Sequence, residues 1–149
     1  MTHDSNKPAL DARVRRSFDR QGLMRHLGAE LTGVRPGAVT IRLPVRDELT
    51  QQHGHVHAGA VSTIADSAGG YAALTLLDED SEVLTVEYKI NLLAPARGEY
   101  LEAEGTVLRS GRTLTVCRLD VRAVNGEART PIAVGQQTLI RVDTVTDER

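Results

Sequence analysis

Apolar residues near the start of the chain recur with the spacing of an α-helix. Within residues 8–20, Leu10, Val14 and Phe18 are four residues apart, and charged side chains fill most of the positions between them. Residues at this spacing lie on one face of a helix and can pack against a core. The sequence therefore predicts an amphipathic N-terminal helix. Phe18 is expected to pack this helix against the core rather than to line a binding pocket. A second, short helical segment is expected over residues 22–28.

The next segments alternate apolar and polar residues, as half-exposed β-strands do. Val39, Ile41 and Leu43 follow this pattern. They come after Pro36-Gly37, which is typical of a tight turn because proline sets the first corner and glycine accepts a positive φ at the second. A hairpin is therefore expected here. Four later segments, joined by the short connections PARG, RSGR and NGEAR, predict an antiparallel meander; they cover residues 84–94, 99–109, 113–124 and 131–142.

One long helix is predicted in the middle of the chain, over residues 57–77, followed by the acidic loop LDEDSE. Small residues dominate this helix, so a sheet can wrap closely around it. Gly69 and Gly70 cost about 1 kcal/mol each relative to alanine. The close approach of another backbone would explain them, and a kink in the helix is the alternative. The order of helix, two strands, long helix and several strands indicates an α+β fold with an antiparallel sheet.

Length and composition restrict the class of protein. A chain of 149 residues fits one domain over residues 1–149, with frayed ends expected at 1–7 and 143–149. The formal net charge is -2, so we expect neither nucleic acid nor a membrane as a partner. No apolar run has the length of a membrane span or the form of a signal peptide. The single cysteine, Cys117, is expected to be an inert core thiol, and its isolation fits a cytoplasmic protein.

Three segments between residues 55 and 121 carry a family pattern. The first is HVHAGAVSTIAD, which ends at Asp66, and the others are VEYKINLLAPARGE and RSGRTLTVCRLDV. They resemble the HGG-x6-D signature, and the strand and hairpin that follow it, in hotdog-fold acyl-CoA thioesterases of the phenylacetate-pathway (PaaI-like) branch. The similarity runs over about residues 23–142. The chain departs from the pattern at Ala58, where the family commonly has glycine, and at Thr85, where it often has serine.

The resemblance implies a fold, an activity and an assembly. In the hotdog fold, a curved antiparallel sheet wraps around one long central helix, here with an additional N-terminal helix. The implied reaction is hydrolysis of a small or medium acyl-CoA or aryl-acyl-CoA to the free acid and coenzyme A. No metal and no bound cofactor is expected, since coenzyme A is part of the substrate. A homodimer is expected at minimum, and a homotetramer of two dimers beyond it.

Hydrolysis of a thioester requires a hydrogen-bond donor for the developing oxyanion and a base or nucleophile at the carbonyl carbon. A helix that begins near His57 would offer the free backbone N–H of Ala58 or Gly59. Asp66 is the candidate base, because a carboxylate among small apolar residues is costly unless it is bonded or functional. It lies about 12 Å along the helix from Ala58, whereas reacting groups must meet within about 3.5 Å. We therefore expect a site shared by two antiparallel helices in a dimer.

Further residues are candidates for positioning the substrate. Gln51 stands where the family commonly has asparagine or glutamine, and it is expected to hold the attacking water or to orient the thioester. Thr85 is expected to hydrogen-bond that water or Asp66. His57 is expected to orient the helix start through its ring. Other substrate contacts are expected near the helix start and at the Gly111 turn, where arginines suit the phosphates of coenzyme A: Gln52, His53, Arg109 and Arg112.

Simpler explanations compete with these roles. Asp66 could be an ordinary surface residue, the two arginines could be solvated turn residues, and Thr85 could be a strand former only. On a strand, the series His53, His55, His57 could bind zinc, but no cysteine or acid at ligand spacing accompanies it. We therefore predict no metal site.

Two alternative functions stay open at the level of sequence. A non-catalytic hotdog module that binds acyl-CoA or another small ligand is the main alternative, since Ala58 and Thr85 both depart from the family pattern. A dehydratase or hydratase of the same fold is less consistent with the motif. The sequence does not identify the acyl group.

Overall fold

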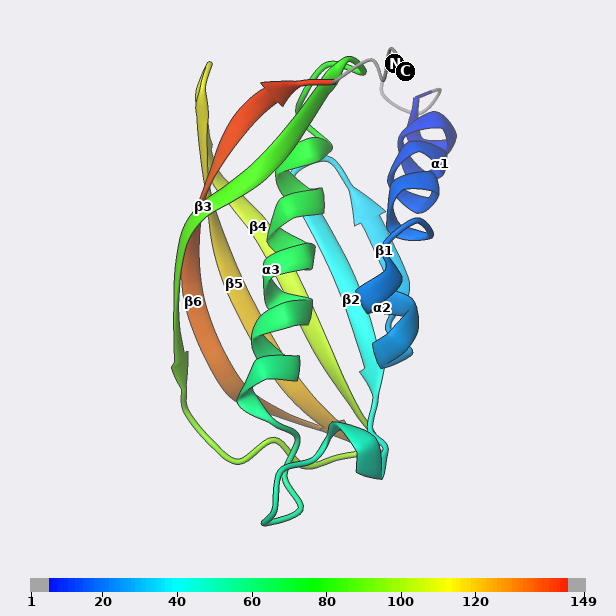
Figure 1. Ribbon diagram of the computed structural model, residues 1–149, viewed down its shortest axis with the longest axis vertical. Coiled ribbons are helices and arrows are strands. Elements are labelled where there is room, and N and C mark those ends of the chain that lie inside the picture. Colours follow the sequence, from blue (N-terminus) through cyan, green and yellow to red (C-terminus); the bar gives the residue numbers. More distant parts are fainter. Residues whose placement is uncertain (1–5, 145–149) are drawn as a thin grey trace.

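A six-stranded antiparallel sheet forms the largest part of the computed structural model, which describes residues 6–144. The strands follow the order β1-β2-β4-β5-β6-β3 and curve around the long helix α3, with α1 and α2 beside β1 (Figure 1). The predicted α+β hotdog architecture is thereby confirmed. The helices are α1 (Lys7–Phe18), α2 (Gly22–Leu27), a 3-10 turn η1 (Asp47–Leu49) and α3 (Ala58–Leu74). The strands are β1 (Glu30–Arg35), β2 (Ala38–Pro44), β3 (Ser81–Leu92), β4 (Tyr100–Ser110), β5 (Leu114–Asn125) and β6 (Ala128–Asp143).

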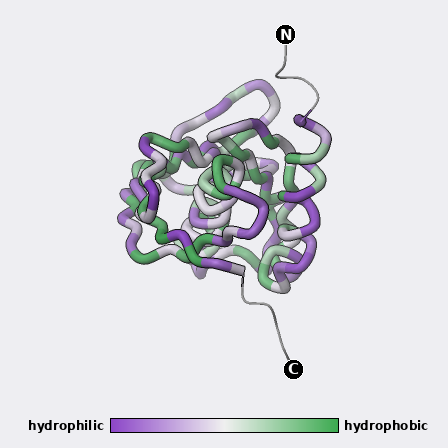
Figure 2. The backbone as a smooth tube through the Cα atoms, turned by 90° about the horizontal axis from the view of Figure 1, so that it is seen from above, coloured by the Kyte–Doolittle hydropathy of each residue, from purple (hydrophilic) through white to green (hydrophobic). Residues whose placement is uncertain are grey.

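Helix α3 packs against the sheet with very little side chain between them. Seen from above, the helix lies in the middle of the molecule, with the strands curved around it (Figure 2). A β-carbon at Gly105 of β4 would fall on the α3 backbone, and one at Gly69 would fall on the side chain of Gln137. The predicted close wrapping is therefore confirmed. This close packing explains why position 69 is a glycine. It does not explain Gly70, where a β-carbon would make only an ordinary contact at 3.8 Å.

The first half of the chain forms the predicted elements. Val14 and Phe18 bury one face of α1, and the Phe18 ring packs against the Tyr71 ring with centroids 6.1 Å apart. Gly37 has a φ of 78°, as the turn between β1 and β2 requires. The predicted frayed ends lie largely outside the described residues. Within them, Lys7 is the first residue of α1 and Asp143 is the last residue of β6.

The predicted meander is correct for β4, β5 and β6 but wrong for β3. This strand pairs with β6 at the edge of the sheet, and β2 lies beside β4 instead. Residues 93–99 cross the end of the sheet rather than forming a hairpin turn. Ala96 O accepts the Val56 N–H at 3.0 Å, and the Leu93 N–H donates to Ile132 O at 2.8 Å. These bonds tie the connection to the loop before α3 and to β6, so the PARG segment is a crossover.

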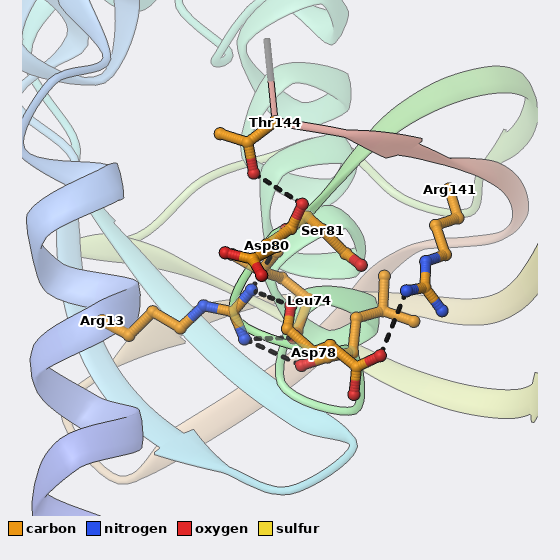
Figure 3. A network of polar contacts seen from close by, with 8 residues as sticks. Arg13, Leu74, Asp78, Asp80, Ser81, Arg141 and Thr144 are labelled. Carbon is orange, nitrogen blue, oxygen red and sulfur yellow. Dashed lines mark hydrogen bonds and ion pairs between the residues drawn. The ribbon is translucent and has the colours of Figure 1, made fainter. Parts of the chain in front are cut away.

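The end of α3 is fastened to α1 by one arginine. The guanidinium of Arg13 donates to four backbone carbonyls at and beyond the end of the helix (Figure 3), those of Leu74, Leu77, Asp78 and Ser81. The distances are 2.8–3.4 Å. Carbonyls at a helix C-terminus lack intrahelical donors and carry partial negative charge, so a cation is favourable there. Across residues 6–144, no helix has both the length and the apolar character needed to cross a membrane.

Candidate active site

The start of α3 leaves one backbone amide free. His57 is the N-cap, and its Nδ1 accepts the N–H of Gly59 at 2.8 Å. The amides of Ala60 and Val61 donate to the carbonyl of His57 at 3.0 and 3.2 Å. Among the residues that the structure describes, none accepts the N–H of Ala58. His57 thus orients the helix start as predicted, and of the two predicted oxyanion donors Ala58 is free while Gly59 is engaged.

A cleft of about 580 Å³ opens beside this amide. Gln51, Gln52, His55 and Ala58 are among its lining residues, together with apolar residues from the crossover after β3. The side chain of Gln51 accepts the N–H of His53, which fixes the loop before the helix. His53 itself is exposed and does not line the cleft. The structure therefore brings together Gln51, Gln52 and the helix start, while His53 lies outside.

The three histidines of the loop have separate roles. His57 caps α3, His53 is exposed, and the ring of His55 accepts a hydrogen bond from Arg97 Nε at 2.7 Å. No group of three or more metal-ligating side chains is found over residues 6–144. Cys117 is fully buried, and burial raises the pKa of its thiol to about 12, so it stays protonated at neutral pH.

Asp66 projects from the middle of α3 toward the edge strand β3. The hydroxyl of Thr85 donates to its Oδ1 at 2.7 Å, which is one of the two contacts expected of Thr85. The side-chain amide of Gln137 donates to the same oxygen at 2.6 Å. Asp66 is half-buried and lines a cavity, and its Oδ2 accepts no hydrogen bond from any described residue. One carboxylate oxygen is thus held and the other is free, an arrangement suited to a base or a nucleophile.

Gln137 is a site residue that the sequence analysis missed. It lies on β6, is 1% exposed, and contacts both Asp66 and Thr85. A signal was present, because strand residues two apart share a face and Gln137 lies two positions before the buried Leu139. A polar amide on the core face of a strand indicates a specific partner.

An irregularity in β3 places Thr85 toward the helix. Thr85 pairs with Leu139 and Glu87 with Thr138, so Val86 is an extra residue between them. Such a β-bulge reverses which alternate positions face inward, and bulges are common beside active sites. Because of the bulge, odd-numbered residues before it and even-numbered residues after it on β3 can contact the same core.

A second cavity, of about 290 Å³, extends from Asp66 toward α1. At its far side the Tyr71 hydroxyl accepts a hydrogen bond from Gln21 Nε2 at 2.8 Å and lies 3.1 Å from Ser17 Oγ. Burial raises the pKa of Tyr71, although its hydrogen bonds with these two residues oppose the effect. The phenol therefore stays protonated at neutral pH and can act as a hydrogen-bond donor.

The two halves of the site lie apart in one chain. The cleft at the helix start and the cavity at Asp66 share no lining residue. Ala58 and Asp66 are separated by about two turns of α3, or about 12 Å along its axis. Each half contains one component of the predicted chemistry, and a single chain does not bring the two together.

The two arginines predicted to meet coenzyme A lie far from the helix start. Arg109 and Arg112 are exposed around the turn between β4 and β5, near the opposite end of α3 (Figure 1). With the residues described here, neither forms an ion pair. Their role in substrate binding stays a prediction. Arg97, on the crossover beside the cleft, is the nearer cation, and no feature of its sequence context marks it.

Comparison with known proteins gives a consistent result. A family model described as the thioesterase superfamily matches residues 53–129. A thioesterase family protein from Silicibacter pomeroyi has a crystal structure with a TM-score of 0.87 and 44% identity, covering 90% of this chain and 98% of that one. The Escherichia coli PaaI protein of the phenylacetic acid degradation operon shares the fold, with a TM-score of 0.81 at 18% identity over 91% of this chain and 94% of that one.

Similar sequences carry related names. A Halobacterium salinarum protein with an esterase name is 32% identical over 133 residues, which cover 84% of this chain and 87% of that protein. Human acyl-coenzyme A thioesterase 13 is 28% identical over 109 residues, covering 72% of this chain and 76% of the human protein.

Proposed function

We infer that this chain, which belongs to the thioesterase superfamily and is a thioester hydrolase, acts on acyl-CoA thioesters. The observation that carries the proposal is the Asp66 carboxylate, held at Oδ1 by Thr85 and Gln137 and free at Oδ2. The name of the human relative supports coenzyme A as the thiol part of the substrate. The cavity of about 290 Å³ beside Asp66 supports an acyl group of small or medium size.

In the proposed reaction, the thioester carbonyl oxygen accepts the Ala58 N–H at the positive end of the α3 dipole. This donor stabilises the oxyanion as the carbonyl carbon becomes tetrahedral. Acting as a base, Asp66 Oδ2 takes a proton from the water that attacks this carbon. The C–S bond then breaks, and the proton passes to the coenzyme A thiolate. Acting as a nucleophile, the same oxygen attacks the carbonyl carbon and expels the coenzyme A thiolate, which gives an acyl anhydride on Asp66. Water then cleaves the anhydride to the free acid and regenerates the carboxylate, and the proton that is released passes to the thiolate. Gln51, in the cleft beside Ala58, orients the thioester or the water.

The reaction requires a second chain, because Ala58 and Asp66 of one chain are too far apart. Strand β3 is the edge through which we propose that two chains associate. It is twelve residues long, its outer side is unpaired over the described part of the chain, and it exposes Leu84 (60%), Val86 (57%) and Leu92 (54%). Long edges with apolar side chains are rarely left open, since they pair readily with other strands.

A two-fold axis at this edge would give the predicted arrangement. Two β3 strands would pair antiparallel, and the two α3 helices would lie antiparallel on the same face of a continuous sheet. Asp66 is bonded to Thr85 on β3, so it lies on the side of α3 that faces this edge. The carboxylate of each chain would then be directed toward the helix of the other. A tetramer of two such dimers is part of the same proposal.

The test is hydrolysis of a panel of acyl-CoA esters of increasing chain length, including aryl-acetyl esters. The rate of hydrolysis is measured from the release of the free thiol. We expect Asp66→Asn to lower kcat/KM by about 10²–10⁴-fold, the range that a general base contributes. Asp19→Asn, an exposed residue at the end of α1, is the matched control and should keep full activity.

Two outcomes would contradict the proposal. One is a folded Asp66→Asn protein with wild-type activity. The other is a wild-type protein that binds acyl-CoA without hydrolysing it, which would favour the non-catalytic binding module considered above.

A further inference from the structure

Gln137 occupies an unusual position for an amide side chain. It lies in the middle of β6, opposite Tyr88 of β3 and Cys117 of β5, and it is 1% exposed. Apolar residues fill most of the core face around it. A buried amide in such surroundings is retained at the expense of apolar packing, so its contacts indicate why it is there.

The contacts of Gln137 are directed at the candidate base. Its Nε2 donates to Asp66 Oδ1 at 2.6 Å and lies 3.1 Å from the Asp66 carbonyl oxygen. It also lies 3.0 Å from Thr85 Oγ1, whose own proton is donated to Asp66 Oδ1. The amide, the hydroxyl and the carboxylate therefore form a closed group of three, in which both donors meet the same carboxylate oxygen.

The other end of the amide has no partner. Gln137 Oε1 is buried, and no donor among the described residues reaches it. Reversing the amide would set Oε1 against the carboxylate and carbonyl oxygens of Asp66, where acceptors repel, and its one available donor, the Thr85 hydroxyl, would then be lost to Asp66. The orientation of the amide is thus set by Asp66, even though it leaves a polar atom unsatisfied.

The helix is also adapted to this amide. A β-carbon at position 69 would fall on Gln137 Oε1, so α3 has room for Gln137 only because Gly69 has no side chain. Gly69 lies in the turn after Asp66, and the helix is weakened by a glycine at this point. The hydrogen bond from Gln137 to Asp66 is therefore accompanied by two destabilising features, an unsatisfied buried oxygen and a glycine within the helix.

We propose that Gln137 is a positioning residue that fixes the carboxylate of Asp66 so that Oδ2 alone is presented to the thioester. This inference rests on the proposed function. Thr85 lies on the edge strand and is exposed, so its hydroxyl by itself leaves the carboxylate free to rotate toward water. The buried amide of Gln137 supplies the second, water-excluded bond. With both donors in place, rotation of the carboxylate would break two hydrogen bonds at once.

The test replaces Gln137 by methionine, which has a similar length and no hydrogen-bonding amide. Gln136→Met is the matched control, because Gln136 is the neighbouring residue on β6 and its side chain is exposed. We expect Gln137→Met to lower kcat by about 10- to 100-fold with KM changed less than about twofold, as misplacement of a catalytic group does. The unfolding midpoint should be unchanged or raised, since an unsatisfied oxygen is removed. Gln136→Met should leave kcat and KM unchanged.

A double-mutant cycle distinguishes positioning from general damage to the core. If Gln137 and Thr85 act through the same carboxylate oxygen, Thr85→Val in the Gln137→Met background should lower kcat by less than it does in the wild type. Fully additive losses, or a Gln137→Met enzyme with wild-type kcat, would overturn the inference.

A measurement that does not depend on activity tests the contact between Gln137 and Asp66 if the variants do not fold or the wild type is inactive. In ¹H–¹⁵N spectra of the wild-type protein, the Gln137 side-chain amide should exchange slowly, and its signal should move in Asp66→Asn, unlike that of Gln136. An amide of Gln137 that exchanges as fast as that of Gln136 would overturn the inference even if the methionine variant does not fold. If the wild type hydrolyses no acyl-CoA, the proposed function fails, while the protected amide would still establish the Asp66–Gln137 contact.

Discussion

Ala58 takes part in the candidate site through its backbone and not through its methyl group. The first position of a helix is the one place where proline fits well, because the N–H it lacks has no intrahelical acceptor. His57 has an extended conformation, with φ -60° and ψ 138°, which a following proline also favours. We therefore expect Ala58→Pro to fold and to lose about 10²–10³-fold in kcat, the usual effect of removing an oxyanion donor. Steady-state hydrolysis of an acyl-CoA ester measures this loss.

Ala58→Gly is the control for the proline variant. It changes the side chain but keeps the N–H, and it restores the residue that is common in the resembled family. Its kcat should stay within a few-fold of the wild type. Equal losses in the proline and glycine variants would mean that the side chain, and not the amide, matters at this position.

The residues of the candidate site could be predicted from the sequence to different degrees. The sequence predicts that Thr85 bonds either the attacking water or Asp66, and its hydroxyl oxygen lies 2.7 Å from Asp66 Oδ1. The engagement of the Gly59 amide was not predictable, because it depends on the ring orientation of His57 rather than on which residues are present. Alternation with Leu139 places Gln137 on the core face of β6, but the sequence does not reveal its partner, because its contact with Asp66 joins residues far apart in the chain.

At the scale of elements, α1 is attached to α3 through Arg13. Its guanidinium bonds four carbonyls at the end of α3, and the loss of such charge-assisted bonds leaves acceptors without donors. We expect Arg13→Met, which keeps the apolar stem, to lower the free energy of unfolding by about 2 kcal/mol. Urea unfolding followed by circular dichroism measures the change.

Arg16→Met is the corresponding control on the same helix. Arg16 is exposed and its side chain makes no hydrogen bond with the residues described. Its replacement should change stability by no more than about 0.5 kcal/mol. If both variants are equally stable, the four carbonyl contacts contribute little, and α1 is held by the packing of Val14 and Phe18 instead.

Local sequence patterns predict the helices and strands well, but they predict less well which strands are neighbours in the sheet. Alternation predicted β2, and small residues predicted a closely wrapped α3, because both signals reside in consecutive residues. The pairing of β3 with β6 joins segments about fifty residues apart, such as Thr85 and Leu139. A short connection resembles a hairpin turn in sequence, and only the hydrogen bonds of residues 93–99 show that the chain crosses to another strand. Strand order is therefore the part of the fold that periodicity does not determine.

At the scale of the whole molecule, one chain contains two incomplete sites. The cleft at the helix start has the free Ala58 amide and no carboxylate among its lining residues, and the cavity at mid-helix has the Asp66 carboxylate but does not include the helix start. A two-fold axis at the β3 edge would combine them into two complete sites per dimer, each using Ala58 of one chain and Asp66 of the other. Activity would then depend on dimer concentration, and no folded monomer would be active.

Mixing two inactive variants tests this arrangement directly. Ala58→Pro and Asp66→Asn each remove one component from every site of their own homodimers. In a mixed dimer, however, the intact Ala58 of the Asp66→Asn chain meets the intact Asp66 of the Ala58→Pro chain. With equal amounts and random exchange of subunits, half of the dimers are mixed and each has one intact site, so about a quarter of the wild-type activity should return. Exchange can be followed by mass spectrometry with one chain isotopically labelled. If subunits exchange fully and no activity returns, each site belongs to a single chain, and the shared-site mechanism is wrong.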